Sequence, residues 1–126
     1  MTFERNLPES IMPESTDRAL CFLVNGLLTT DKYEIAGTLF DEMLSRQGEI
    51  RLLILYKKFE GWEEAATKMD MGFGLKYGSH LTRMALVNPP AMMISQLKLR
   101  KAERDKCEVR YFNADDFQTA LAWVNE

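Results

Sequence analysis

Short apolar runs alternate along this chain with longer segments in which apolar side chains recur every three or four positions. The runs are ALCFLV at residues 19–24, RLLILY at 51–56 and MALV at 84–87, with a mixed run, VRYF, at 109–112. A short apolar run bounded by turn residues is typical of a strand buried on both faces. We therefore predict four strands separated by helices.

The first two helices have recognisable ends. Asp31 followed three residues later by Glu34 predicts a capping pair, and Gly48 is the residue type that commonly ends a helix. A second helix is predicted from about residue 62 to 77, with Gly78 in the terminal position. The buried face of the first helix consists of Tyr33, Ala36, Phe40, Met43 and Leu44.

Two further helices complete the pattern. Asn88 is predicted to cap the third, whose first turn contains Pro89 and Pro90, where a missing N–H costs least. Asn113 is predicted to cap the last. Alternating strands and helices predict an α/β fold with a mostly parallel sheet and right-handed crossovers. The apolar face of the last helix consists of Phe117, Ala120, Leu121 and Val124.

Chain length and composition narrow the class of protein. A chain of 126 residues without internal repeats fits a single domain over residues 1–126. Residues 1–17 are polar and contain Pro8 and Pro13, which predicts an N-terminal arm or an edge strand. The formal net charge of −3 argues against a nucleic-acid partner. No run approaches the roughly 20 apolar residues of a membrane span, and no signal peptide is recognisable, so we expect a cytoplasmic protein.

The sequence offers few candidates for chemistry. Cys21 and Cys107 have no Cys or His near them in sequence and are expected to be free thiols. A single histidine, His80, does not make a metal site. An acidic cluster at the start of the second helix is explained by the helix dipole more simply than by acid–base catalysis. We predict no catalytic residue, metal or cofactor. The cluster consists of Glu60, Glu63 and Glu64.

The residues after the second predicted strand attract attention because ligands of α/β domains bind at the carboxyl ends of strands. Phe59, Glu60, Gly61 and Trp62 are predicted to form a turn here. The turn contains two aromatic side chains and no Ser, Thr, Cys or His. It is therefore interpreted as a binding turn and not a catalytic one.

The second helix carries apolar residues on two faces. Trp62, Ala65, Ala66, Met69 and Phe73 form the stripe expected to face the core, whereas Met71 and Leu75 fall on the opposite side. The pair is either two isolated surface residues or a contact with a partner, a ligand or lipid. Because glycines lower helix propensity, this helix is predicted to be movable. The glycines are Gly72 and Gly74.

The third helix repeats this arrangement. Its face made of Met93, Ile94 and Leu97 is opposite Met92 and Leu99. The distal segment, residues 96–106, has five basic and two acidic residues, a local charge of +3. The helix either rests on an anionic membrane surface or is a buried helix with a solvated basic tail. The basic residues are Lys98, Arg100, Lys101, Arg104 and Lys106.

Four segments carry a family resemblance: GLLTTDKYE, RLLILYKKFEGW, FGLKYGSHLTRMALV and EVRYFNADDFQTALAWV. Together they resemble the bacterial SpoIIAA-like family, which consists of STAS-type (anti-sigma-factor-antagonist-like) domains related in fold to CRAL-TRIO lipid-transfer domains. The match extends from about Leu20 to the C-terminus. The resemblance implies a four- or five-stranded sheet with about four flanking helices, and a binding or regulatory module that is not an enzyme.

The resemblance also implies where a site would lie. True anti-sigma antagonists carry a phosphorylated Ser or Thr at the turn after the central strand, and residues 59–62 here contain no hydroxyl. The lipid-transfer relatives instead hold apolar ligands between the sheet and movable helices, and they associate with membranes. The expected ligand-binding residues are Phe59, Gly61, Trp62, Met69, Phe73, Leu75, Met92 and Met93. The expected partner or membrane face consists of Met71, Leu75, Lys98, Arg100 and Lys101.

Two hypotheses follow. In the first, the chain binds a hydrophobic or amphipathic small molecule and contacts the inner membrane peripherally. In the second, it is a protein-interaction module, acting as a homodimer or as a partner switch without the phosphorylatable residue.

Overall fold

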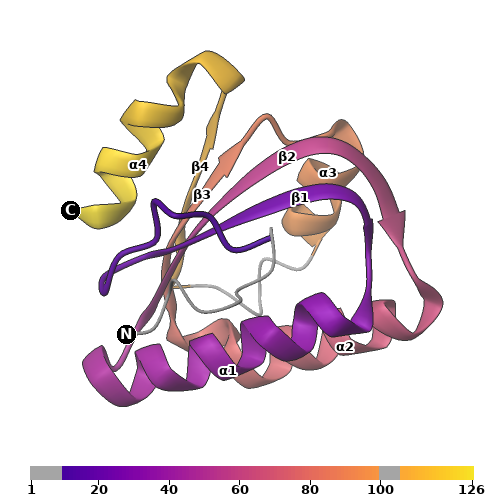
Figure 1. Cartoon of the computed structure of the whole chain (residues 1–126), viewed down its shortest axis with the longest axis horizontal. Coiled ribbons are helices and arrows are strands. Elements are labelled where there is room, and N and C mark those ends of the chain that lie inside the picture. Colours follow the sequence, from indigo (N-terminus) through magenta and orange to yellow (C-terminus); the bar gives the residue numbers. More distant parts are fainter. Residues whose placement is uncertain (1–9, 100–105) are drawn as a thin grey trace.

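A computed structural model describes residues 10–99 and 106–126 of the chain (Figure 1). Over these residues, strands and helices alternate as predicted from the sequence. The strands are β1 (Leu20–Leu28), β2 (Ile50–Trp62), β3 (Leu81–Val87) and β4 (Glu108–Phe112). The helices are α1 (Thr30–Gln47), α2 (Glu64–Tyr77), α3 (Ala91–Leu99) and α4 (Phe117–Asn125), and short 3-10 helices occur at Gly78–His80 and Ala114–Asp116.

The described strands form one four-stranded parallel sheet in the order β1-β2-β3-β4. Right-handed crossovers between strands in sequential order place their helices on the same face. Accordingly α1, α2 and α3 pack on one face of the sheet, and α4 packs on the other (Figure 1). The α/β class and the parallel sheet predicted from the sequence are confirmed.

The two faces of β2 explain why its sequence lacks a polar-apolar alternation. Leu52, Ile54 and Tyr56 contact the core beneath α1–α3, whereas Leu53 and Leu55 contact the core beneath α4. A strand covered by helices on both faces is apolar at every position.

Strand β2 is longer than predicted. The expected turn at residues 59–62 is instead the end of this strand, and it pairs in parallel with β1 through Gly26↔Phe59 and Leu28↔Trp62. The prediction of a turn was therefore wrong. The turn was predicted because the apolar run ends at Tyr56, whereas the pairing with β1 keeps the chain extended as far as Trp62.

The end of β2 is bent by two irregularities in its pairing with β1. Between Asn25↔Lys57 and Leu28↔Trp62, β2 has two more residues than β1, and its backbone reaches positive φ at Lys58 (47°) and Gly61 (102°). Extra residues of this kind bend a strand and increase its twist. In Figure 1, the joined ends of β1 and β2 curve toward α1 and α2.

The ends of the helices differ from the predicted ends more than the helices differ in their overall position. Gly48 ends α1 in the left-handed conformation as predicted (φ 76°), but Thr29 precedes the helix in place of Asp31, and its own side chain makes no capping bond. The N–H of Thr30 instead donates to Glu63 Oε1 at 3.3 Å. Helix α2 begins at Glu64, later than predicted. Gly78 follows α2 with right-handed helical angles, because the chain continues into a 3-10 turn.

Asn88 does not cap α3. Its φ is 58°, a conformation that Asn tolerates better than most residues. Its side-chain amide donates to Tyr56 O at 3.1 Å, and its backbone N–H donates to Phe112 O at 2.8 Å. Asn88 therefore ties together β2 and β4, and the carbonyl of Pro90 accepts the first bonds of α3. Asn113 does not cap α4 either. It precedes the 3-10 turn at Ala114–Asp116 and makes no side-chain capping bond, and Asp116 is the residue that precedes α4.

The outer edge of β1 is covered by the segment before it. Ile11 forms an antiparallel bridge with Phe22. The N–H of Leu23 donates to Ser10 O at 2.7 Å, and that of Met12 donates to Cys21 O at 2.9 Å. Covering an edge in this way satisfies backbone groups that would otherwise be open to pairing with another chain.

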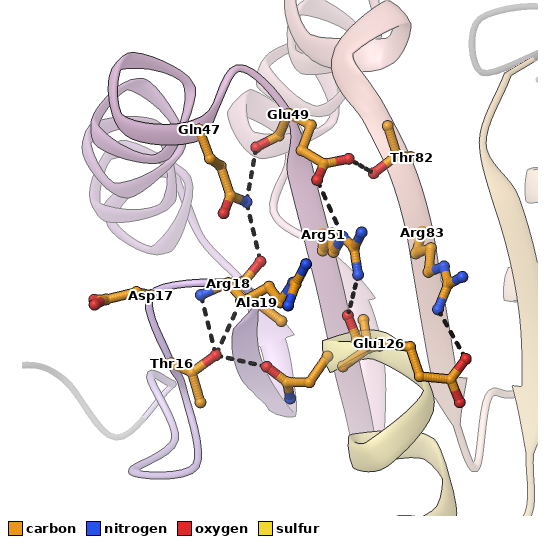
Figure 2. A network of polar contacts seen from close by, with 12 residues as sticks. Thr16, Asp17, Arg18, Ala19, Gln47, Glu49, Arg51, Thr82, Arg83 and Glu126 are labelled. Carbon is orange, nitrogen blue, oxygen red and sulfur yellow. Dashed lines mark hydrogen bonds and ion pairs between the residues drawn. The ribbon is translucent and has the colours of Figure 1, made fainter.

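Polar contacts gather at the amino ends of the strands (Figure 2). Arg51 Nη1 donates to Val124 O at 3.3 Å, and Arg83 Nη1 donates to Trp123 O at 2.7 Å. Glu49 accepts a bond from Thr82 Oγ1 at 2.6 Å. The two arginines satisfy carbonyls in the last turn of α4, where the helix dipole also favours positive charge. The network is a structural anchor for α4.

Candidate functional site

A cavity of about 530 Å³ lies between the sheet and helices α1, α2 and α3. Its volume falls in the range of about 300–1,000 Å³ that is usual for small-molecule sites. Apolar side chains from the sheet form much of its wall: Phe22, Leu52, Ile54, Met84 and Leu86. An apolar wall of this kind suits an apolar ligand.

Aromatic rings from α1 and α2 form the helical wall of the cavity. Phe40, Phe73 and Tyr77 have centroids 5.1–5.7 Å apart. Gly37 allows the two helices to approach closely, because a Cβ at this position would lie 3.3 Å from Phe73 Cζ. The aromatic cluster joins the two helices and leaves the cavity on their sheet-facing side.

A chain of hydrogen bonds lies at the end of the cavity where β2 curves toward the helices. Trp62 Nε1 donates to the Tyr33 hydroxyl at 2.8 Å, and this hydroxyl donates to Asp70 Oδ1 at 2.8 Å. All three residues line the cavity. Since they come from β2, α1 and α2, the hydrogen bonds fasten three elements to one another.

Two tyrosine hydroxyls in the cavity wall are strongly held in their neutral form. Burial raises the pKa of Tyr33, and the nearby charge of Asp70 raises it further. The pKa of Tyr56 is also raised, first by burial and then by Asp70. Both side chains therefore act as hydroxyl groups and not as phenolates at ordinary pH.

The structure brings together part of the ligand-binding set expected from the sequence. Trp62, Phe73 and Met93 line the cavity. Met71, assigned to the partner face, also lines it and is 58% exposed, which places it at the rim.

The other expected ligand-binding residues lie outside the cavity lining. Phe59 packs edge-on against the rings of Tyr56 and Trp62, and Gly61 provides the positive φ that bends β2. The remaining three lie on α2 and α3: Met69 is partly buried, Met92 is 51% exposed and Leu75 is 82% exposed.

The expected membrane face is described in part. Lys98, on α3, is exposed beside Leu99, which is 81% exposed. Arg100 and Lys101 lie outside the described residues. Leu75 and Met92 add exposed apolar side chains on α2 and α3.

Sequence reasoning missed Tyr33 and Asp70 as site residues. Tyr33 was assigned to the buried face of its helix, and Asp70 was given no role. The available signal was helical spacing: Thr67, Asp70, Met71 and Gly74 lie three or four residues apart and all line the cavity. Thr67 and Met71 are exposed to solvent as well as lining the cavity.

The remaining candidate groups give no second site in residues 10–99 and 106–126. No group of three or more His, Cys, Asp or Glu side chains in this part of the chain is arranged to hold a metal ion. Neither Cys21 nor Cys107 takes part in a disulfide within the described residues, and burial, with a smaller effect of Glu14, raises the pKa of Cys21 to about 12. None of the described helices has the length and apolar character of a membrane span.

A parallel sheet with three helices on one face and an apolar cavity beneath them defines a small α/β domain of the STAS type. Residues 19–125 match the SpoIIAA-like family, and the chain belongs to this family. Its fold is similar to that of an uncharacterised protein with a SpoIIAA-like fold from Shewanella loihica PV-4. The two are 24% identical, with a TM-score of 0.61 over 84% of this chain and 83% of the other. No curated protein matches the sequence.

Proposed function

We propose that this chain is a non-enzymatic binding module that holds a hydrophobic or amphipathic small molecule between the sheet and helices α1–α3. The observation that carries the proposal is the apolar cavity of about 530 Å³. Protein interiors are normally packed without such spaces. A largely apolar space with a few polar groups at one end is the usual form of a ligand site.

Helix α2 supports entry of a ligand from solvent. Its residues Thr67 and Met71 are exposed and also line the cavity, as does Gln96 on α3. Gly72 and Gly74 lower the helix propensity of α2 by up to about 1 kcal/mol each. A small movement of α2 away from α3 would widen the opening between them.

A phospho-switch is not part of the proposal. Residues 59–62 lie within β2, and none of them has a hydroxyl group.

Peripheral membrane contact belongs to the same proposal. The exposed Leu99 and Met92 lie on the same helix as Lys98. Apolar side chains inserted among lipid head groups, with a basic residue near anionic phosphates, are the usual features of such contacts. The membrane would then supply the apolar ligand.

Mild purification followed by native mass spectrometry is expected to detect a co-purified apolar molecule, as a mass above that of the polypeptide. In parallel, the protein is expected to co-sediment with vesicles that contain anionic lipid. A mass equal to that of the polypeptide together with no vesicle binding contradicts this function.

The alternative is a protein-interaction module, favoured by the 82% exposure of Leu75 beside a partly apolar α2 surface. If this face forms a homodimer, light scattering of the wild type gives twice the mass of the chain, and Leu75→Glu halves it. Lys76→Glu is the matched control, because Lys76 is also an exposed residue of α2. A wild-type mass equal to one chain excludes the homodimer.

A further inference from the structure

One buried hydroxyl in the cavity wall has no hydrogen-bond partner among the described residues. Tyr56 lies on β2, is 4% exposed and lines the cavity. Its backbone oxygen accepts a bond from Asn88 Nδ2 at 3.1 Å, but within residues 10–99 and 106–126 its hydroxyl forms no hydrogen bond. Native proteins rarely leave a buried polar group without a partner, because losing its bonds to water is costly. The Tyr56 hydroxyl therefore needs an explanation.

The other phenol and indole groups of the wall use their protons within the protein. The Tyr33 hydroxyl accepts from Trp62 Nε1 at 2.8 Å and gives its own proton to a carboxylate. The Tyr77 hydroxyl donates to Asp41 Oδ1 at 2.8 Å. Tyr56 differs from these residues because its proton is available to a bound molecule.

The Tyr56 hydroxyl faces the open space of the cavity. Within the described residues, the side-chain atoms that are sealed from open space without a hydrogen-bond partner are Glu14 Oε1 and Arg51 Nε. The Tyr56 hydroxyl is not among them, so its oxygen remains accessible although the side chain is buried in the cavity wall. The ring is also held in place, since it packs edge-on against Phe59 with centroids 6.0 Å apart. A fixed hydroxyl at free space is a preformed contact for a ligand.

The protonation state of Tyr56 decides what it offers. Burial is the largest cause that raises its pKa, so the side chain is a neutral phenol at ordinary pH. Such a group has one proton to donate and lone pairs that accept. Orphaned donors are rarer in proteins than acceptors that are only partly used. The ligand group that meets Tyr56 is therefore expected to accept its proton.

From this geometry we propose that the ligand is an apolar molecule with a neutral carbonyl group, and that the carbonyl oxygen accepts a hydrogen bond from the Tyr56 hydroxyl. A carbonyl accepts without bringing a proton that needs a partner of its own, and a neutral group avoids the cost of placing a charge in a largely apolar space. The inference rests on the proposed function, since it names the chemical class of the molecule in the cavity. It makes Tyr56 a residue that determines specificity.

Benzophenone and diphenylmethane test this inference, since they differ only in a carbonyl group that replaces a CH₂ group. Binding of each is measured by displacement of the neutral dye Nile red and checked directly by equilibrium dialysis. The ratio of the two affinities does not depend on how tightly the dye itself binds. In Tyr56→Phe, the affinity for benzophenone is expected to fall about tenfold relative to that for diphenylmethane, as is usual when a carbonyl loses one hydrogen bond.

Tyr111→Phe is the matched control, because it loses the same hydroxyl from a residue that is 43% exposed and outside the described cavity lining. It is expected to retain the wild-type ratio. Since Tyr56→Phe removes a hydroxyl without a partner, the unliganded variant is expected to unfold at the wild-type temperature or a higher one. A lower unfolding temperature would mean that the hydroxyl has a partner in the folded protein, and it would contradict the inference.

A spectroscopic measurement detects the bond itself. The carbonyl ¹³C resonance of labelled benzophenone is expected to lie at higher frequency when bound to the wild type than in a hydrocarbon solvent, and to lose this shift in Tyr56→Phe. An unshifted resonance in the wild type overturns the inference, and this holds even if the variant does not fold.

The outcomes separate the two proposals. If neither probe displaces Nile red and neither binds in dialysis, the proposed function fails, and the inference fails with it. If both probes bind but Tyr56→Phe leaves the ratio of their affinities unchanged, the cavity remains a binding site and the inference about Tyr56 is overturned. The same holds if the wild type binds diphenylmethane alone.

Discussion

Trp123→Ala is expected to lower the free energy of unfolding by about 3–5 kcal/mol, as is usual when a large buried aromatic residue is truncated. Trp123 is 4% exposed and packs with Ala85 and Val87 in the core beneath α4. The guanidinium groups of Arg83 and Arg110 lie 5.1 and 4.7 Å from its ring centroid. Cation–π contacts of this kind add about 0.5–1 kcal/mol each at partly exposed sites. Urea denaturation measures the change.

Tyr111→Ala is the control for this prediction, because Tyr111 is also aromatic but is 43% exposed, on β4. Its truncation is expected to cost much less, about 1 kcal/mol or below. Equal costs at the two positions would mean that α4 does not cover the sheet as described. Since α4 lies on the face opposite the cavity, Trp123→Ala at temperatures where it stays folded is expected to bind Nile red as the wild type does.

Gly74→Trp is expected to abolish binding of Nile red in the cavity. Gly74 lines the cavity from α2, so the largest side chain placed there takes up space that the dye needs. Replacing glycine within a helix also raises helix propensity, which offsets part of any packing strain. Fluorescence titration measures the affinity, and thermal unfolding confirms that the variant is folded.

Gly72→Trp is the matched control, because Gly72 lies on the same helix and, among the described residues beyond its own stretch of helix, no atom lies within 4 Å of a Cβ built on it. It gains the same side chain and the same helix propensity but leaves the cavity unchanged. The control is expected to bind Nile red as the wild type does. Loss of binding in both variants would show that the dye contacts the surface of α2 and not the cavity.

Much of the fold follows from local sequence patterns. The apolar runs predict the strands because a strand covered on both faces has no polar positions, and Leu52 to Leu55 contact cores on alternating sides. Gly48 ends α1 in the left-handed conformation that glycine allows without strain. These features depend on the residue and its near neighbours, so they can be read from the sequence.

Features set by pairing between distant segments were predicted wrongly. Residues 59–62 were predicted to form a turn because they follow an apolar run, and they are extended because Gly26 and Leu28 pair with Phe59 and Trp62. Asn88 has the features of a helix cap, yet its side chain bonds to Tyr56 O across the sheet. In each case a contact with a residue far away in sequence outweighs a local preference.

The sequence by itself determined the parallel α/β class, the family resemblance and three residues of the cavity wall, Trp62, Phe73 and Met93. Only the tertiary structure decided how large the cavity is, which other side chains line it, and that Tyr33 and Asp70 meet at its end, 37 positions apart in the chain. The physical reason is that hydrophobic periodicity records which side of an element is buried, but not how far a helix stands from the sheet. That spacing depends on how β2 bends and how α1 and α2 pack at Gly37.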